Sequence, residues 1–186
     1  MNRRTDVSPV ALGAKLGLYA GLTCAVFYLI LYAIKPALLI SPAILLGFAI
    51  VVVFKIAAAY YSWKSQEGRV TFQSALQSIF LVSAVSLLIV FFFFYLVFNV
   101  IDLSLVEQIK KNITDNLMKS FQAGKLSKSQ LDESLLKVME FKLGAGAFFA
   151  LYSFSLFVGF FYALVFSGIT RLISREISLS SSHSNN

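Results

Sequence analysis

The chain has 186 residues, of which 58% are apolar and only 13% are charged, and its formal net charge is +7. Soluble globular domains average about 45–50% apolar and about 25% charged residues, so this composition excludes an ordinary soluble domain. The mean hydropathy of +0.79 points the same way. The basic residues stand at the ends of apolar stretches and in short loops, which favours membrane topology over nucleic-acid binding.

Four long apolar stretches follow one another along the chain. They are Val10–Ile34, Leu38–Trp63, Phe72–Val100 and Leu143–Ile173. A helix needs roughly 20 apolar residues to cross the ~30 Å hydrocarbon core of a bilayer. The sequence therefore predicts an all-α polytopic membrane protein with four transmembrane helices. Residues 1–175 form a single membrane domain, and residues 176–186 form a polar tail that we expect to be disordered.

Small residues recur at every fourth position in the first and fourth spans. They are Gly13, Gly17 and Gly21 in the first span, and Ser155, Gly159, Ala163 and Ser167 in the fourth. Small side chains at this spacing let helix backbones approach closely, which favours helix association in lipid. We expect them to be helix-packing positions within one chain. Homo-oligomerisation and contact with another membrane subunit are the alternatives.

Two lysines, Lys15 and Lys55, lie well inside apolar stretches. A charge within a membrane span is costly and marks a functional site by default. Two interpretations stay open for both residues. Their long stems can carry the ammonium groups toward the membrane surface, or they contact the phosphate of an anionic lipid between helices.

The orientation in the membrane follows from the basic residues near the span ends. With four spans, both termini and the loop after the second span lie on one side, and that side carries Arg3, Arg4, Lys64, Arg69, Arg171 and Arg175. Cytoplasmic loops are enriched in Lys and Arg close to the membrane. The seven lysines of residues 101–142 count against this assignment. Most of them are spread along that segment, however, whereas the basic residues on the other side lie close to the span ends. We expect both termini in the cytoplasm.

Residues 101–142, between the third and fourth spans, have the pattern of an extramembrane helical hairpin. Ser104 with Glu107, and Ser127 with Gln130, have the spacing of capping boxes that begin helices. Gly124 is suited to end the first helix. Each helix carries an apolar stripe. We expect these stripes to pack on each other or on the bilayer surface, and a docking groove for a partner is the alternative.

The spans contain no aspartate, glutamate or histidine, so a proton relay has no carrier in them. The single cysteine, Cys24, can form neither an intramolecular disulfide nor a metal cluster. We therefore expect no catalytic residue, no cofactor and no metal site, and a protein that is not an enzyme.

Four segments resemble the small bacterial membrane family called domain of unknown function 4199 (DUF4199), found mostly in Bacteroidota. They are Glu67–Leu76 (EGRVTFQSAL), Phe98–Asp102 (FNVID), Gly124–Gln130 (GKLSKSQ) and Phe157–Arg171 (FVGFFYALVFSGITR). The resemblance covers most of residues 10–175 and implies four spans without established catalytic residues. It also implies a membrane-associated glycosyltransferase as a partner, because genes of the family tend to lie near one.

These observations favour a non-enzymatic accessory or scaffold subunit of an inner-membrane assembly. The family resemblance adds the hypothesis that this assembly handles lipid-linked sugars. The alternative is a small transporter or channel whose pore is formed by several copies of the chain.

Overall fold

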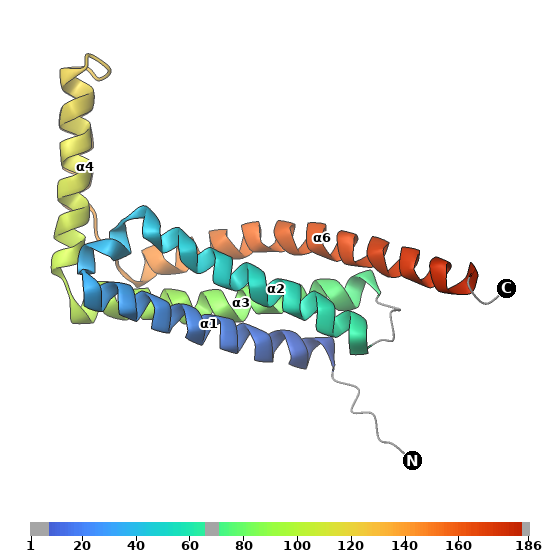
Figure 1. Cartoon of the computed structure of the whole chain (residues 1–186). Coiled ribbons are helices and arrows are strands. Elements are labelled where there is room, and N and C mark those ends of the chain that lie inside the picture. The colour runs from blue at the N-terminus through green and yellow to red at the C-terminus, as the bar shows by residue number, and fades with distance from the viewer. Residues whose placement is uncertain (1–7, 66–70, 184–186) are drawn as a thin grey trace.

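The computed structural model describes residues 8–65 and 71–183, and within them the chain is helical without any strand. The longer helices are α1 (Pro9–Ile34), α2 (Leu46–Ser65), α3 (Phe72–Leu96), α4 (Ser104–Gln122), α5 (Lys128–Glu140) and α6 (Ala145–His183) (Figure 1). Short helical turns lie between them: the 3-10 turns η1 (Pro36–Ile40) and η2 (Pro42–Leu45), and the π turn η3 (Val97–Ile101).

Four helical stretches are long and apolar enough to cross a membrane, which confirms the predicted fold class. They are Pro9–Ile34, Pro42–Lys64, Phe72–Ile101 and Ala145–Ile173. The second span begins at Pro42 rather than at the predicted Leu38. Pro36 and Pro42 each begin a 3-10 turn, because proline fits the first position of a helix but interrupts its interior.

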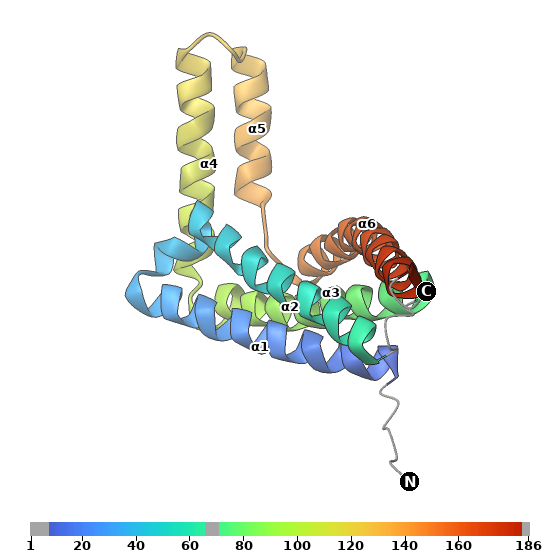
Figure 2. The same ribbon diagram turned by 45° about the vertical axis from the view of Figure 1, so that its right-hand side comes forward.

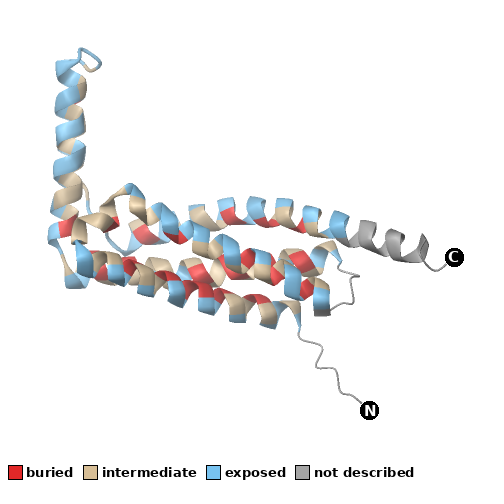
Figure 3. Cartoon of the chain, viewed as in Figure 1, coloured by how far each residue is buried: buried red, intermediate tan, exposed pale blue. Residues whose placement is uncertain are grey.

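The four spanning helices pack as a bundle in which α3 is central. Helix α3 packs extensively on α1 and on α6, whereas α2 lies against α1 and α3 and has few contacts with α6 (Figure 2). Burial follows this arrangement. Helix α3 carries many of the buried residues, while much of α6 is exposed along its length (Figure 3).

Helices α4 and α5 form an antiparallel hairpin, and its first cap differs from the prediction. The Ser104 amide donates to Asp102 Oδ1 at 3.0 Å, and the Ser104 hydroxyl donates to the same oxygen at 2.6 Å. The predicted capping box of Ser104 with Glu107 is therefore wrong. The Asp102 side chain, two residues earlier, accepts the hydrogen bond of the Ser104 amide at the start of the helix. Ser104 itself is the first residue of α4 and does not cap it.

The turn between α4 and α5 follows the sequence prediction. Gly124 has φ +70°, and the Lys125 amide donates to the Ser120 carbonyl oxygen at 3.0 Å, as in a glycine-terminated helix. Ser127 then begins α5. Its hydroxyl accepts from the Gln130 amide, and the Gln130 side chain accepts from the Ser127 amide. The second capping box is confirmed.

The hairpin does not continue the bundle but projects from one end of it. In both views α4 runs across the direction of the spanning helices (Figures 1 and 2), and Figure 2 shows α5 beside it. The near end is held in place because Leu105 is fully buried and Val106 and Ile109 pack against the core at this end of the bundle. The Gly124 turn, at the far end of the hairpin, is exposed.

The end of the chain also differs from the prediction. Helix α6 continues to His183, where we expected a disordered tail from residue 176. Residues 174–182 contain neither proline nor glycine, the two residues that most strongly end a helix. Residues 184–186 lie outside the described part of the chain.

Candidate functional site

The glycine face of the first span lies directly against α3. A Cβ atom at Gly17 would lie 2.9 Å from the Leu81 carbonyl oxygen, and one at Gly21 would lie 2.9 Å from Ile89 Cβ. A Cβ atom at Gly13 would lie even closer, 2.5 Å from the Ser78 carbonyl oxygen. A larger side chain at Gly13 or Gly17 would have to displace backbone atoms of α3, and one at Gly21 would first meet the Ile89 side chain. The stripe therefore lies in a contact within the chain.

The small residues of α6 also face α3, but this contact is looser. A Cβ atom at Gly159 would lie 3.4 Å from Ser83 Cβ, an ordinary van der Waals contact. Ala163 is fully buried with Ala75 and Ile79 of α3. Ser155, at the start of the stripe, is only half-buried. Substitutions on α6 should thus be tolerated better than substitutions on α1.

Serine hydroxyls connect three of the spanning helices at one end of the bundle. The Ser62 hydroxyl of α2 donates to Ser78 Oγ of α3 at 3.0 Å, and the Ser78 hydroxyl lies 3.2 Å from the Pro9 carbonyl oxygen of α1. Deeper in the bundle, Ser83 and Ser86 are fully buried and donate to carbonyl oxygens of their own helix. These hydroxyls are satisfied within the protein.

Lys55 of α2 is the one buried charged residue in the described part of the chain. Only 8% of the residue is exposed. Its ammonium nitrogen lies 5.7 Å from the centre of the Tyr162 ring of α6, a cation–π contact. Both interpretations of Lys55 from the sequence, a stem that carries its charge toward the membrane surface and contact with a lipid phosphate, stay predictions.

Lys15 occupies a different environment, because it lies on the exposed side of α1. Its side chain is free to reach toward the end of the bundle. Contact with an anionic lipid stays a prediction for this residue. The structure thus separates two lysines that the sequence pattern grouped together.

The opposite end of the bundle holds a hydrogen-bonded network that the sequence analysis missed. The Tyr28 hydroxyl donates to the Ile44 carbonyl oxygen at 3.1 Å, and the Tyr32 hydroxyl lies 3.4 Å from Asp102 Oδ2. Asp102 therefore joins α1 to the cap of α4. The sequence carried one signal for these hydrogen bonds: two tyrosines, Tyr28 and Tyr32, stand one helical turn apart. A tyrosine hydroxyl within a bundle usually has a hydrogen-bond partner.

Gly47 gives Tyr28 the space that this network requires. A Cβ atom at Gly47 would overlap the Tyr28 hydroxyl group. The Cys24 thiol also donates to the Gly47 carbonyl oxygen at 3.5 Å and is buried. The first turn of α2 is thereby held close to α1.

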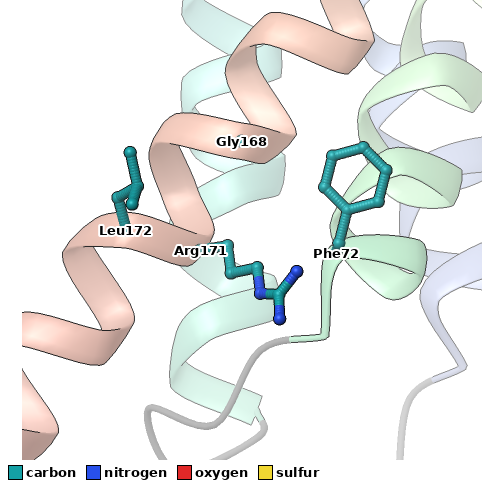
Figure 4. Close-up of a pocket in the computed structure, with 4 residues that line it drawn as sticks. All are labelled: Phe72, Gly168, Arg171 and Leu172. Atoms are coloured by element: carbon teal, nitrogen blue, oxygen red, sulfur yellow. The ribbon is translucent and has the colours of Figure 1, made fainter.

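An open cleft of about 610 Å³ lies between the start of α3 and α6, lined by Phe72, Gly168, Arg171 and Leu172 (Figure 4). A Cβ atom at Gly168 would meet nothing within 4 Å, so the cleft is wide at this point. Arg171 is exposed. Within the described residues, no three His, Cys, Asp or Glu side chains lie close enough together to hold a metal ion.

The comparison with protein families matches residues 15–171 to the family described as "Protein of unknown function (DUF4199)". The chain belongs to the DUF4199 family. The match covers most of the chain and confirms the resemblance seen in the sequence motifs. Neither the curated proteins nor the solved structures include a significant match to this chain.

The DUF4199 chain is thus a helical, multi-pass membrane protein with two features on which a function can be based. One is the α4–α5 hairpin, which leaves the bundle at the Asp102 end. The other is the contact of the buried Lys55 of α2 with the Tyr162 ring of α6.

Proposed function

We propose that this DUF4199 protein is a non-enzymatic accessory or scaffold subunit of an assembly in the bacterial inner membrane, with both termini in the cytoplasm. The observation that carries the proposal is the α4–α5 hairpin, which projects from a compact bundle and keeps large apolar side chains exposed. Leu136 and Met139 are 62% and 74% exposed, and Met118 of α4 is 41% exposed. Exposed apolar clusters on a polar element are characteristic of interaction surfaces.

The interior of the bundle supports a structural role over a transport pathway through one chain. Ala20, Ala58 and Val82 fill the contact between α1, α2 and α3, and the buried serines are hydrogen-bonded within the protein. A transporter or channel would have to form between several copies. The resemblance to the family suggests an assembly that handles lipid-linked sugars, with a membrane-associated glycosyltransferase as the first partner to test.

The test is purification of the tagged protein from membranes of its native host in mild detergent, with quantitative mass spectrometry of co-purifying proteins. We expect a partner in fixed ratio that is lost when Leu136 and Met139 are both changed to Ser. Changing Asn112 and Asn116 to Ser, an exposed polar pair on α4, should leave the complex intact and serves as the matched control. Absence of a stoichiometric partner, or equal loss in both variants, would contradict the proposal.

A further inference from the structure

We propose that Lys55 pairs with a carboxylate on a transmembrane helix of a different membrane protein, which docks beside α2 and α6. This inference rests on the proposed role as an assembly subunit and adds the chemistry of the partner. The starting observation is that Lys55 is only 8% exposed and has, among the described residues, an aromatic ring as its one electrostatic partner.

The charge balance of this region is incomplete within the described residues. Lys55 has no salt bridge or hydrogen bond there, and the Tyr162 ring at 5.7 Å is its only electrostatic partner. A ring face attracts a cation, but it carries no net negative charge. A buried charge without a counter-ion is strongly unfavourable, so an anion from outside the chain would stabilise the site.

The depth of Lys55 identifies which kind of anion can reach it. Lys55 precedes Lys64, at the end of the second span, by nine residues, so ~14 Å of helix separates them. Tyr162 precedes Arg171 of α6 by the same number of residues. Half of the hydrocarbon core is ~15 Å, which places the pair near the bilayer centre. A carboxylate on a spanning helix reaches this depth, whereas a lipid phosphate lies at the membrane surface.

A second copy of this chain cannot provide the carboxylate. Residues 10–34, 38–63, 72–100 and 143–173 contain neither aspartate nor glutamate, so the acidic residues of this chain lie outside the membrane core. The partner must therefore be a different protein. Charge complementarity at the bilayer centre then gives both affinity and selectivity, because an uncharged helix leaves Lys55 unpaired.

The α2–α6 side of the bundle is the side from which such a helix can approach. The two helices have few contacts with each other, and Tyr162, which covers the ammonium group, is 56% exposed. Phe161 and Val165 extend the same exposed region of α6. A docked helix would cover these side chains and place its carboxylate where the Tyr162 ring now contacts Lys55.

The experiment measures energy transfer between the labelled full-length protein and labelled Leu/Ala transmembrane peptides of about 22 residues in phosphatidylcholine vesicles. One peptide has a central Asp, and its matched control has Leu there. We expect wild type to bind the Asp peptide at least about tenfold more tightly than the Leu peptide. Lys55→Met should abolish this preference, whereas Lys55→Arg and Lys15→Met should retain it.

Two results would overturn the inference: an equal preference in wild type and Lys55→Met, or no preference in wild type. The peptide change removes the charge without altering the protein, so a poorly folded variant cannot mask the outcome. Native mass spectrometry in phosphatidylglycerol vesicles provides the second arm. Lipid retention that depends on Lys55, without any peptide preference, would assign the site to a lipid phosphate instead. A failed peptide test with an intact native complex would refute this inference and leave the scaffold role standing.

Discussion

At the residue scale, the close contact between α1 and α3 depends on the absence of a side chain at Gly17. Gly17→Leu would drive a branched side chain into the Leu81 carbonyl oxygen and Val85 Cβ, each 2.9 Å from an added Cβ. Overpacking of this kind typically costs about 1–3 kcal/mol. We expect a clear loss of thermal stability in detergent, measured by the unfolding midpoint.

Gly168→Ala is the matched control for this substitution. Gly168 is also a glycine within a spanning helix, but an added Cβ would meet nothing within 4 Å. Alanine favours helix over glycine, so this change should be neutral or slightly stabilising. Phe92→Leu, at an exposed ring, should also be mild. Equal stability of Gly17→Leu and the controls would contradict the proposed packing role.

A second prediction at this scale concerns the ion pair on α5. Lys137 Nζ donates to Glu133 Oε1 at 2.7 Å, which lowers the pKa of Glu133 and raises that of Lys137. The pair therefore contributes above the ordinary glutamate pKa of 4.5 and is lost as the pH falls through the lowered value. Carboxyl carbon NMR should show Glu133 titrating at higher pH in Lys137→Gln than in wild type. Identical titration curves would show that the pair does not form in solution.

At the scale of elements, the start of α4 depends on Asp102 rather than on Ser104. Asp102→Ala removes the acceptor of the Ser104 amide and of the Tyr32 hydroxyl, and loss of a helix cap costs about 1 kcal/mol. We expect faster hydrogen exchange in the first turn of α4. Ser104→Ala keeps the Asp102 cap on the backbone and should exchange nearly as slowly as wild type. The opposite ranking would restore Ser104 as the capping residue.

The same element shows what sequence could and could not predict. Spacing along one helix identified the Ser127 capping box and the Gly124 turn, because both depend on residues a few positions apart. Asp102 was missed as a cap because Ser104 and Glu107, three positions apart, have the spacing of a capping box and offered a competing helix start. The contact of Lys55 with Tyr162 joins residues far apart in the sequence. This contact depends on which face each of α2 and α6 turns toward the other. The length of an apolar stretch predicts a span but not the rotation of the helix about its axis.

At the scale of the whole molecule, we expect the four spans to place both termini on one side of the membrane and the hairpin on the other. We expect a reporter that is active only in the periplasm to be inactive when fused after Asn186 and active when inserted at Gly124. Gly124 lies in an exposed turn, so an insertion there should preserve the bundle. The reverse pattern of activity would invert the orientation and leave the four spans unchanged.

The tightest helix contact joins α1 to α3, which are not neighbours in the sequence, and this has a consequence during biosynthesis. When α1 and α2 have entered the membrane, the glycine face of α1 has no surface to pack on until α3 follows. Roughly 30 residues separate the end of α2 from the end of α3, and their translation takes a few seconds at about 5–20 residues per second. During that interval the nascent chain exposes a narrow, close-packing helix face to the lipid and to the insertion machinery. A chaperone or insertase that shields small-residue helix faces would act on this protein between its second and third spans.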